Sequence, residues 1–282
     1  MTGELYIDGI DAYLAFGITA VGYNALVSYP PLKAVTIIDY PDENGIRVDL
    51  NSPKLDARTF DMTVYVDSIQ DLSSLQNYIL NGREHTWNFY KIGLTKTLYV
   101  KKIGNPRKTG YFFIVSITLV DNYPLENYSY SMPNLTSQTR DLNFKLDNVK
   151  FARYGIVPLQ GTEAQLLLPE SPKSRLTITN STMSGQDYDD STSYLAARDV
   201  TIYLFIYKKK ADFWAGYNAF LYNLTTPGAK SLQYTTRSTD VGTISATKNC
   251  YYKSGRVTDI AVTDYNTKIW CKFEVTLCLI NR

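Results

Sequence analysis

The clearest pattern of hydrophobic and polar positions lies between Leu55 and Gly82. It opens with apolar residues at every second position, Phe60, Met62, Val64 and Val66. That alternation predicts a half-buried strand. The period then changes to helical spacing at Leu72, Leu75 and Ile79. Ser68 followed by Asp71 predicts a capping box, and Gly82 predicts a left-handed residue at the helix end.

The same strand-then-helix pattern returns 140 residues later, where Leu195-Ala196-Ala197-Arg198 repeats Leu55-Asp56-Ala57-Arg58 (198 − 58 = 140). The second strand has its apolar face at Val200, Ile202, Leu204 and Ile206. Helical spacing follows at Trp214, Tyr217, Leu221 and Leu224, and Pro227-Gly228 is expected to end the helix.

The flanks of this unit also match in order. Asp8-Gly9-Ile10 corresponds to Asp147-Asn148-Val149, and Leu98-Tyr99-Val100-Lys101 corresponds to Cys250-Tyr251-Tyr252-Lys253. The offset grows from 155 − 17 = 138 to 275 − 117 = 158. We therefore expect a duplicated domain with loop insertions in the second copy. The longest insertion is expected at Thr179–Ser193, which is rich in Ser, Thr, Asp and Gly.

The expected fold is mainly β, with two tandem, duplicated β-sandwich or barrel domains, each flanked by one α-helix. Residues 1–125 are predicted to form the first domain and residues 143–282 the second. Residues 126–142, rich in Asn, Tyr, Ser and Pro, are the expected linker. The two helices are expected at Ile69–Asn81 and Asp212–Asn223, and a hairpin at 35–50.

Composition narrows the class of protein only slightly. Hydrophobic residues make up 44% and charged residues 20% of the 282 residues, as in globular proteins. A net charge of +2 gives no reason to expect sequence-specific nucleic-acid binding. No signal peptide and no apolar run of roughly 20 residues are visible, so synthesis in a bacterial cytoplasm without membrane insertion is expected. The 24 tyrosines suit either half-buried strand faces or contacts with other subunits.

The search for catalytic and metal-binding residues finds no pattern that indicates an enzyme. We therefore expect no catalytic activity, no cofactor and no metal site. His85 is the only histidine, and the cysteines Cys250, Cys271 and Cys278 are expected to be buried free thiols. No glycine-rich phosphate loop is present. Asp187-Tyr188-Asp189-Asp190 lacks the glycine and the distal glutamate of a calcium loop.

Arg58 and Arg198 are the most informative charged pair, because they occupy the same place in both copies. Two interpretations stay open. Each arginine is either solvated at the start of a strand or part of a subunit interface, where guanidinium groups favour carboxylates.

One family resemblance rests on three short motifs, Leu5-Tyr6-Ile7-Asp8-Gly9-Ile10, Phe16-Gly17-Ile18 and Ser52-Pro53-Lys54-Leu55-Asp56-Ala57-Arg58. With these motifs, residues 4 to 122 resemble the N-terminal domain of siphophage distal tail proteins, especially those of Bacteroides-type phages and prophages. The resemblance implies a β-sandwich with a flanking helix, in a ring at the tail tip between the tube and the receptor-binding parts. Tube, hub and distal tail roles are not separated by it.

The expected function is thus a structural ring protein of a phage or prophage virion tail. Its partners would be copies of itself and other tail proteins. Six ring positions can be filled by a hexamer or by a trimer of two-domain chains, and the insertion expected in the second copy favours the hexamer. The alternative is a tandem β-sandwich adhesin or carbohydrate binder. Many distal tail proteins carry a sugar-binding-like second domain, but here the second half resembles the first.

Overall fold

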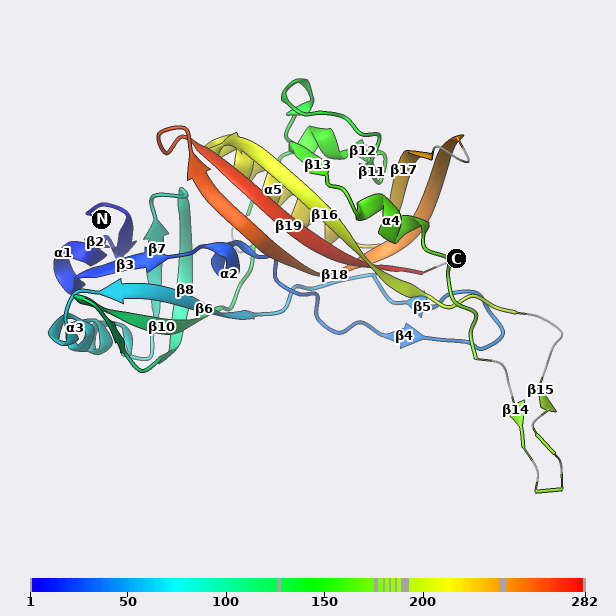
Figure 1. The fold of residues 1–282 in the computed structure, drawn as a ribbon, viewed down its shortest axis with the longest axis horizontal. Coiled ribbons are helices and arrows are strands. Elements are labelled where there is room, and N and C mark those ends of the chain that lie inside the picture. The colour runs from blue at the N-terminus through cyan, green and yellow to red at the C-terminus, as the bar shows by residue number, and fades with distance from the viewer. Residues whose placement is uncertain are drawn as a thin grey trace.

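The computed structural model describes residues 2–125, 128–174, 177–179, 181–182, 184–185, 187–188, 193–238 and 242–280. In these ranges the protein is mainly β, with two large antiparallel sheets and few helices, as the sequence predicts. Each sheet is a single curled layer that resembles half of a barrel, and the two lie side by side along the molecule (Figure 1).

The first sheet comes from the N-terminal half of the chain. Its strands, in spatial order, are β2 (Ile10–Asp11), β1 (Leu5–Ile7), β7 (Glu84–Phe89), β8 (Leu94–Ile103), β10 (Phe112–Asp121), β6 (Arg58–Val66) and β3 (Ile18–Val21), with β9 (Arg107–Thr109) also on β10.

The second sheet repeats this order from the C-terminal half. Its strands are β12 (Val149–Lys150), β11 (Lys145–Leu146), β17 (Lys230–Ser238), β18 (Gly242–Thr263), β19 (Lys268–Leu279), β16 (Arg198–Lys209) and β13 (Ile156–Pro158). Every strand on the first path thus has a counterpart at the same place on the second. The expected duplication is confirmed.

The tight turn between the first two strands of each copy shows why weak sequence matches can be meaningful. Asp8 and Gly9 have φ of 50° and 82°, and Asp147 and Asn148 have φ of 48° and 68°. Two consecutive positive φ angles define the hairpin turn for which Asp-Gly and Asn are favoured. The Asp8 carboxylate also accepts the Thr86 N–H at 2.8 Å, as Asp147 accepts that of Ser231 at 2.7 Å. The same residue types recur because the turn requires them.

One long helix follows the first long strand of each copy, α3 (Ile69–Ile79) and α5 (Lys210–Leu224). Ser68 caps the helix as expected, because its hydroxyl accepts the Asp71 N–H at 3.1 Å; this hydroxyl also donates to the Asp71 carboxylate at 2.6 Å. Gly82 is left-handed as expected, but it does not close the helix, which ends at Ile79 with Leu80 as its C-cap residue. The remaining helical turns are α1 (Ala12–Phe16), α2 (Asn24–Val27), η1 (Thr136–Gln138), η2 (Phe151–Tyr154) and α4 (Thr162–Leu167).

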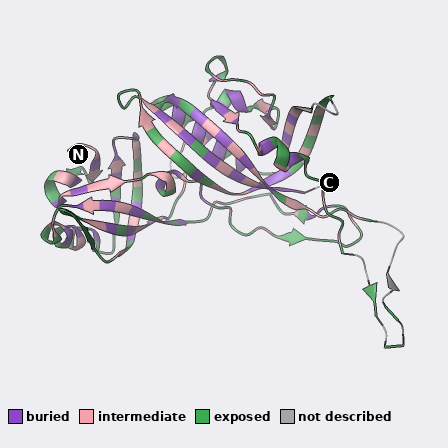
Figure 2. Cartoon of the chain, viewed as in Figure 1, coloured by how far each residue is buried: buried purple, intermediate pink, exposed green. Residues whose placement is uncertain are grey.

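Buried side chains alternate along the strands and form one core that continues from the first sheet into the second (Figure 2). The predicted strand faces are all buried, from Phe60 to Val66 and from Val200 to Ile206. The predicted helix stripes are buried too, with Leu75 at 0% and Tyr217 at 2% exposure. Because the core is shared, the two halves are packed together rather than only tethered.

The expected insertion at Thr179–Ser193 is wrong. A small hairpin of β4 (Ile37–Ile38) and β5 (Arg47–Val48) has its counterpart in β14 (Thr177–Ile178) and β15 (Asp187–Tyr188). The offset is 177 − 37 = 140 at the first strand and 187 − 47 = 140 at the second. The extra length lies later, since α5, β17 and β18 have 15, 9 and 22 residues where α3, β7 and β8 have 11, 6 and 10.

The expected linker, in its described part from 128 onward, packs against α5. The Tyr130 ring stacks on Tyr222 with centroids 4.7 Å apart, and the Tyr130 hydroxyl accepts from Asn223 at 3.1 Å. Leu135 is buried. This stretch therefore belongs to the surface of the second half.

Candidate functional site

The contact between the two halves is the best-defined candidate site, and it is built by one segment that occurs in both. We call residues 22–57 the first crossing segment and residues 162–197 the second crossing segment. Each runs from the edge strand of its sheet through a short helix and a small hairpin. Matching bridges, Leu32 with Leu55 and Pro172 with Leu195, close both segments at an offset of 140 (172 − 32 and 195 − 55). The first crossing segment lies across the second half (Figure 1).

At the centre of this contact, Tyr29 of the first crossing segment inserts beside α5. Its hydroxyl donates to the Tyr217 carbonyl at 2.6 Å, and the Tyr217 hydroxyl donates back to the Val27 carbonyl at 2.9 Å. The ring centroids are 4.2 Å apart, and both side chains are buried. Burial raises the pKa of both phenols well above the ordinary value. These hydroxyls are therefore neutral structural donors.

The sheet makes room for this ring with a glycine. A Cβ on Gly255 would lie 2.9 Å from the Tyr29 ring, closer than packed carbons approach. Tyr252, on the same strand, donates its hydroxyl to the Pro30 carbonyl at 2.5 Å. The Val257 N–H donates to the Ser28 hydroxyl at 2.9 Å. The second half thus satisfies polar groups of the first crossing segment as well as its apolar ring.

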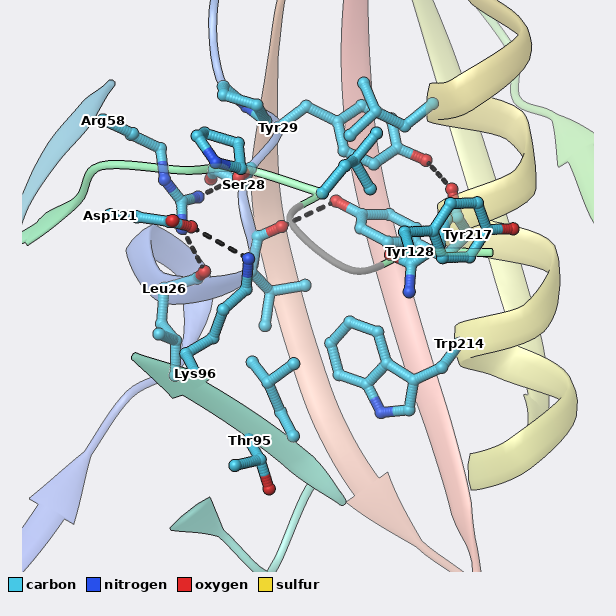
Figure 3. A pocket seen from close by; sticks show the side chains of 17 residues that line it. Leu26, Ser28, Tyr29, Arg58, Thr95, Lys96, Asp121, Tyr128, Trp214 and Tyr217 are labelled. Carbon is cyan, nitrogen blue, oxygen red and sulfur yellow. Dashed lines mark hydrogen bonds and ion pairs between the residues drawn. The ribbon is translucent and has the colours of Figure 1, made fainter. Parts of the chain in front are cut away.

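Arg58 holds the other side of the same segment. Its guanidinium donates to the carbonyls of Leu26 at 2.6 Å and Ala25 at 3.1 Å, and also to that of Ser28. These are the carbonyls at the end of α2, where a helix favours a cation. The guanidinium lies 3.9 Å from the carboxylate of Asp121, which also binds the Lys96 ammonium at 2.9 Å (Figure 3). Arg58 therefore fixes the crossing segment to its own sheet.

Arg198 performs the same task in the second half. Its guanidinium donates to the carbonyls of Gln165 at 2.9 Å and Leu166 at 3.1 Å, at the end of α4. Solvation is the wrong interpretation for Arg58, which is only 9% exposed, whereas Arg198 is half-buried. The two arginines lie in separate halves rather than in one site. A further contact of either with another subunit stays a prediction.

A cavity of about 210 Å³ opens between the halves at this junction. Its wall carries the Arg58, Lys96 and Asp121 charges on one side, with Tyr128 and Trp214 on the other (Figure 3). The Trp214 indole N–H donates to the Ile92 carbonyl at 2.8 Å. Asp121 is the carboxylate of this wall and is already paired with two cations, so it is poorly suited to act as a general base.

The remaining candidates for chemistry are engaged in structural contacts. His85 is fully buried, with Nδ1 2.6 Å from the Asp8 carboxylate and Nε2 3.2 Å from the Asn81 side-chain oxygen. Burial acts to raise the Asp8 pKa, but hydrogen bonds from His85, Thr86 and Tyr78 outweigh it and lower the pKa. This Asp–His pair resembles part of a catalytic triad, but its second ring nitrogen faces an amide oxygen and no hydroxyl.

The three cysteines are buried and free. Burial raises the pKa of Cys250 to about 12 and that of Cys278 to about 11, and it raises the pKa of Cys271 as well. Thiols with such pKa values are unreactive at neutral pH. Within the described residues, no cluster of three or more His, Cys, Asp or Glu side chains could hold a metal. The side chains of Asp187-Tyr188-Asp189-Asp190 lie outside the described residues.

The fold and this junction define a mainly β protein of two similar half-barrel units that pack through one crossing segment. No protein-family model matches the chain, and no curated protein matches its sequence. None of the helices in the described ranges is long and apolar enough to span a membrane.

Sequence reasoning missed most of the junction residues, namely Tyr29, Lys96, Asp121, Tyr252 and Gly255. Tyr29-Pro30-Pro31 reads only as a break in regular structure, and Gly255 has no local motif. The roles of Tyr29, Tyr252 and Gly255 come from contacts across more than 180 residues, such as Tyr29 with Tyr217, and those of Lys96 and Asp121 from contacts between different strands. Only the paired position of Arg58 and Arg198 was visible beforehand.

Proposed function

We propose that the protein is a structural subunit of a phage or prophage tail tip, a distal tail or hub ring protein that joins the tail tube to receptor-binding parts. Two independent features support this proposal. The motifs between residues 4 and 122 resemble distal tail proteins. The first half also packs on the second through a crossing segment that both halves possess, and this observation carries the proposal.

Such a contact joins unlike faces of similar units. Each unit then has a donor side, its crossing segment, and an acceptor side, its sheet. Contacts of this heterologous kind extend from one unit to the next until a ring closes. Three chains with two units each supply six ring positions. Because the second crossing segment carries no insertion, both copies can occupy equivalent positions, and we favour the trimer with pseudo-sixfold symmetry over the hexamer.

The chemistry of the described residues also suits a structural role. His85 and Asp8 are engaged with each other, the thiols are held protonated, and Asp121 is paired with two cations. Large buried networks of this kind stabilise a subunit that must remain intact in a virion.

The proposal is tested by light scattering and negative-stain electron microscopy of the purified chain, up to millimolar concentration. The measurements are repeated with the proteins encoded beside its gene. We expect rings of three or six chains, and neighbouring genes for tape-measure and tail-fibre proteins. A stable twofold dimer that buries the Arg58 and Arg198 regions would overturn the ring. A chain that stays monomeric under all these conditions would overturn it as well.

The alternative, a carbohydrate-binding or adhesin module, is favoured by one observation. Trp214 and Tyr128 line the cavity at the junction, and aromatic rings are common in sugar sites. A glycan array separates the two proposals. Saturable binding by the wild-type chain that is lost in Trp214→Ala, without ring formation, would favour the binding module.

A further inference from the structure

The two crossing segments have different surroundings. Ile46 and Leu50 of the first one pack on the outer face of β18 and β19, where Tyr251 and Cys278 are each only 5% exposed. In the second one, the small hairpin of β14 and β15 extends away from the body of the molecule (Figure 1). One docking contact is thus made within the chain, and the described residues of the second crossing segment make no counterpart of it.

The surface that would receive the second crossing segment is present on the first sheet. Tyr251 pairs with Cys278 across β18 and β19, and at the same register Tyr99 pairs with Val120 across β8 and β10. Tyr99 and Val120 are half-exposed, whereas their counterparts are covered. We call Lys33, Leu55, Ala57, Tyr99 and Val120 the acceptor face.

Lys33 is the most specific element of the acceptor face. Its counterpart Lys173 (173 − 33 = 140) pairs with Asp39 and donates to the carbonyls of Tyr40 and Gly45, each at 2.6 Å. The backbones match, because Lys33 N–H donates to the Lys54 carbonyl at 2.8 Å and Lys173 N–H to that of Tyr194 at 2.7 Å. The Lys173 side chain is 8% exposed, while Lys33 is exposed and forms no ion pair with any other described residue.

The second half also exposes apolar residues on its donor side, at the helix end whose counterpart in the first half packs beside α5. Val27, at the end of α2, is 5% exposed because it is buried in the junction. Its counterpart at the end of α4 is Leu167 (167 − 27 = 140), which is 44% exposed, and the next residue, Leu168, is 53% exposed. Leu167 and Leu168 are therefore exposed to solvent at the helix end where the first half buries Val27.

We propose that the second half of one copy docks on the acceptor face of another copy, which repeats between chains the contact made within each chain. This inference rests on the proposed function and names the surface that builds the ring. The occupant is a second copy because the contact continues, at equivalent positions, an interface already formed within the chain, with Pro169 in place of Tyr29. The acceptor side differs from it, because Asn122 lies where the second sheet has Ile280. The contact between chains is thus more polar and weaker than the one within them.

The test uses one variant for each side of the contact. Tyr99→Glu removes the acceptor, and the double variant Leu167→Glu with Leu168→Glu removes the donor. Tyr111→Glu is the matched control, because Tyr111 is 98% exposed in the turn before β10 and outside the acceptor face. Sedimentation velocity is measured over the concentrations at which the wild-type chain assembles. Each face variant should associate at least about tenfold more weakly than wild type. The control should assemble like wild type.

A mixture gives the sharper outcome. Acceptor and donor variants together retain one working contact, so they should form a 1:1 dimer and stop. A mixture that stays monomeric would show that the two faces do not bind each other. If both variants assemble like wild type, the ring uses another surface, and the inference fails while the proposed function stands. If the wild-type chain never assembles, both fail. Circular dichroism checks folding, and Lys33→Glu, at an exposed side chain, replaces Tyr99→Glu if that variant unfolds.

Discussion

At the scale of single residues, the paired arginines act through the ends of short helices. Arg58 is the more important of the two for stability, because its side chain is buried. It donates to three carbonyls and forms an ion pair with Asp121. Arg198 is half-buried and holds two carbonyls, and the residue paired with it on β19 is Leu279, where the first half has Asp121. A cation removed from a buried network leaves its partners without compensation.

We therefore expect Arg58→Met to lower the free energy of unfolding by about 3 kcal/mol. Arg198→Met, which leaves fewer and less buried acceptors unpaired, should cost about 1 kcal/mol. Urea denaturation followed by circular dichroism measures both. Equal losses would mean that the Asp121 network adds nothing to the helix-end contacts.

A buried thiol should make stability depend on alkaline pH. The Cys250 pKa rises from its usual 9.0 to about 12, so the unfolded chain releases this proton first. The stability that depends on the protonated thiol is fully present below pH 9.0 and is lost as pH rises towards about 12. Urea unfolding at pH 8, 9, 10 and 11 should show wild type losing stability faster than Cys250→Ala above pH 9, by up to about 1.4 kcal/mol per pH unit. Parallel curves would contradict the assignment.

At the scale of elements, each long helix is held by an apolar stripe against its sheet. Leu75 of α3 is fully buried in the core, and Ile69 at the start of the same helix is 53% exposed. Leu75→Ala should lower the free energy of unfolding by about 2 to 5 kcal/mol, since it leaves a cavity. Ile69→Ala is the control and should change it by less than about 0.5 kcal/mol. A small loss for Leu75→Ala in chemical denaturation would mean that the stripe is not packed.

Helix α5 depends on one close approach. A Cβ on Gly216 would collide with the Tyr154 carbonyl oxygen, so the helix can lie on η2 only with glycine there. Gly216→Ala should therefore destabilise by more than about 1 kcal/mol, although alanine favours helix. Ala215 is exposed on the same helix, and Ala215→Gly should cost about 1 kcal/mol through propensity alone. A thermal melt in which Gly216→Ala is more stable than wild type would refute the close contact.

At the scale of the whole molecule, the continuous core predicts that both halves unfold together. Trp87 is buried in the first half and Trp270 lies on β19 of the second, so variants that retain only one of these two among the three tryptophans report each half separately. Both should show the same urea midpoint.

The joint unfolding of the two halves should depend on the Tyr29 ring at the junction. Removal of its ring by Tyr29→Ala should cost about 3 kcal/mol or more, because it empties a packed site at the junction. Tyr265→Ala is the control, because its ring is fully exposed in the turn between β18 and β19. If the two tryptophans report different urea midpoints while Tyr29 is still present, the halves unfold as independent units. The shared core is then unimportant for stability.

The sequence by itself determined the class of fold and its duplication. Period-two and helical stripes, the Ser68 cap and the Asp8-Gly9 turn are local signals, because each depends on residues a few positions apart. The paired position of Arg58 and Arg198 followed from the repeat. The roles of these arginines did not, because the carbonyls that they bind lie 30 or more residues away.

Only the tertiary structure decided how the halves meet. The partners of Tyr29 and the need for glycine at 255 depend on contacts between distant strands. The offsets of 140 at Arg58 and 158 at Ile117 already place the added residues after Arg198, and the structure assigns them to α5, β17 and β18. The crossing segments differ in residue type, since Tyr29 and Leu50 of the first correspond to Pro169 and Asp190 in the second. Which side chains of the first are covered was still decided by packing, because burial is a property of what lies opposite a side chain and not of its neighbours along the chain.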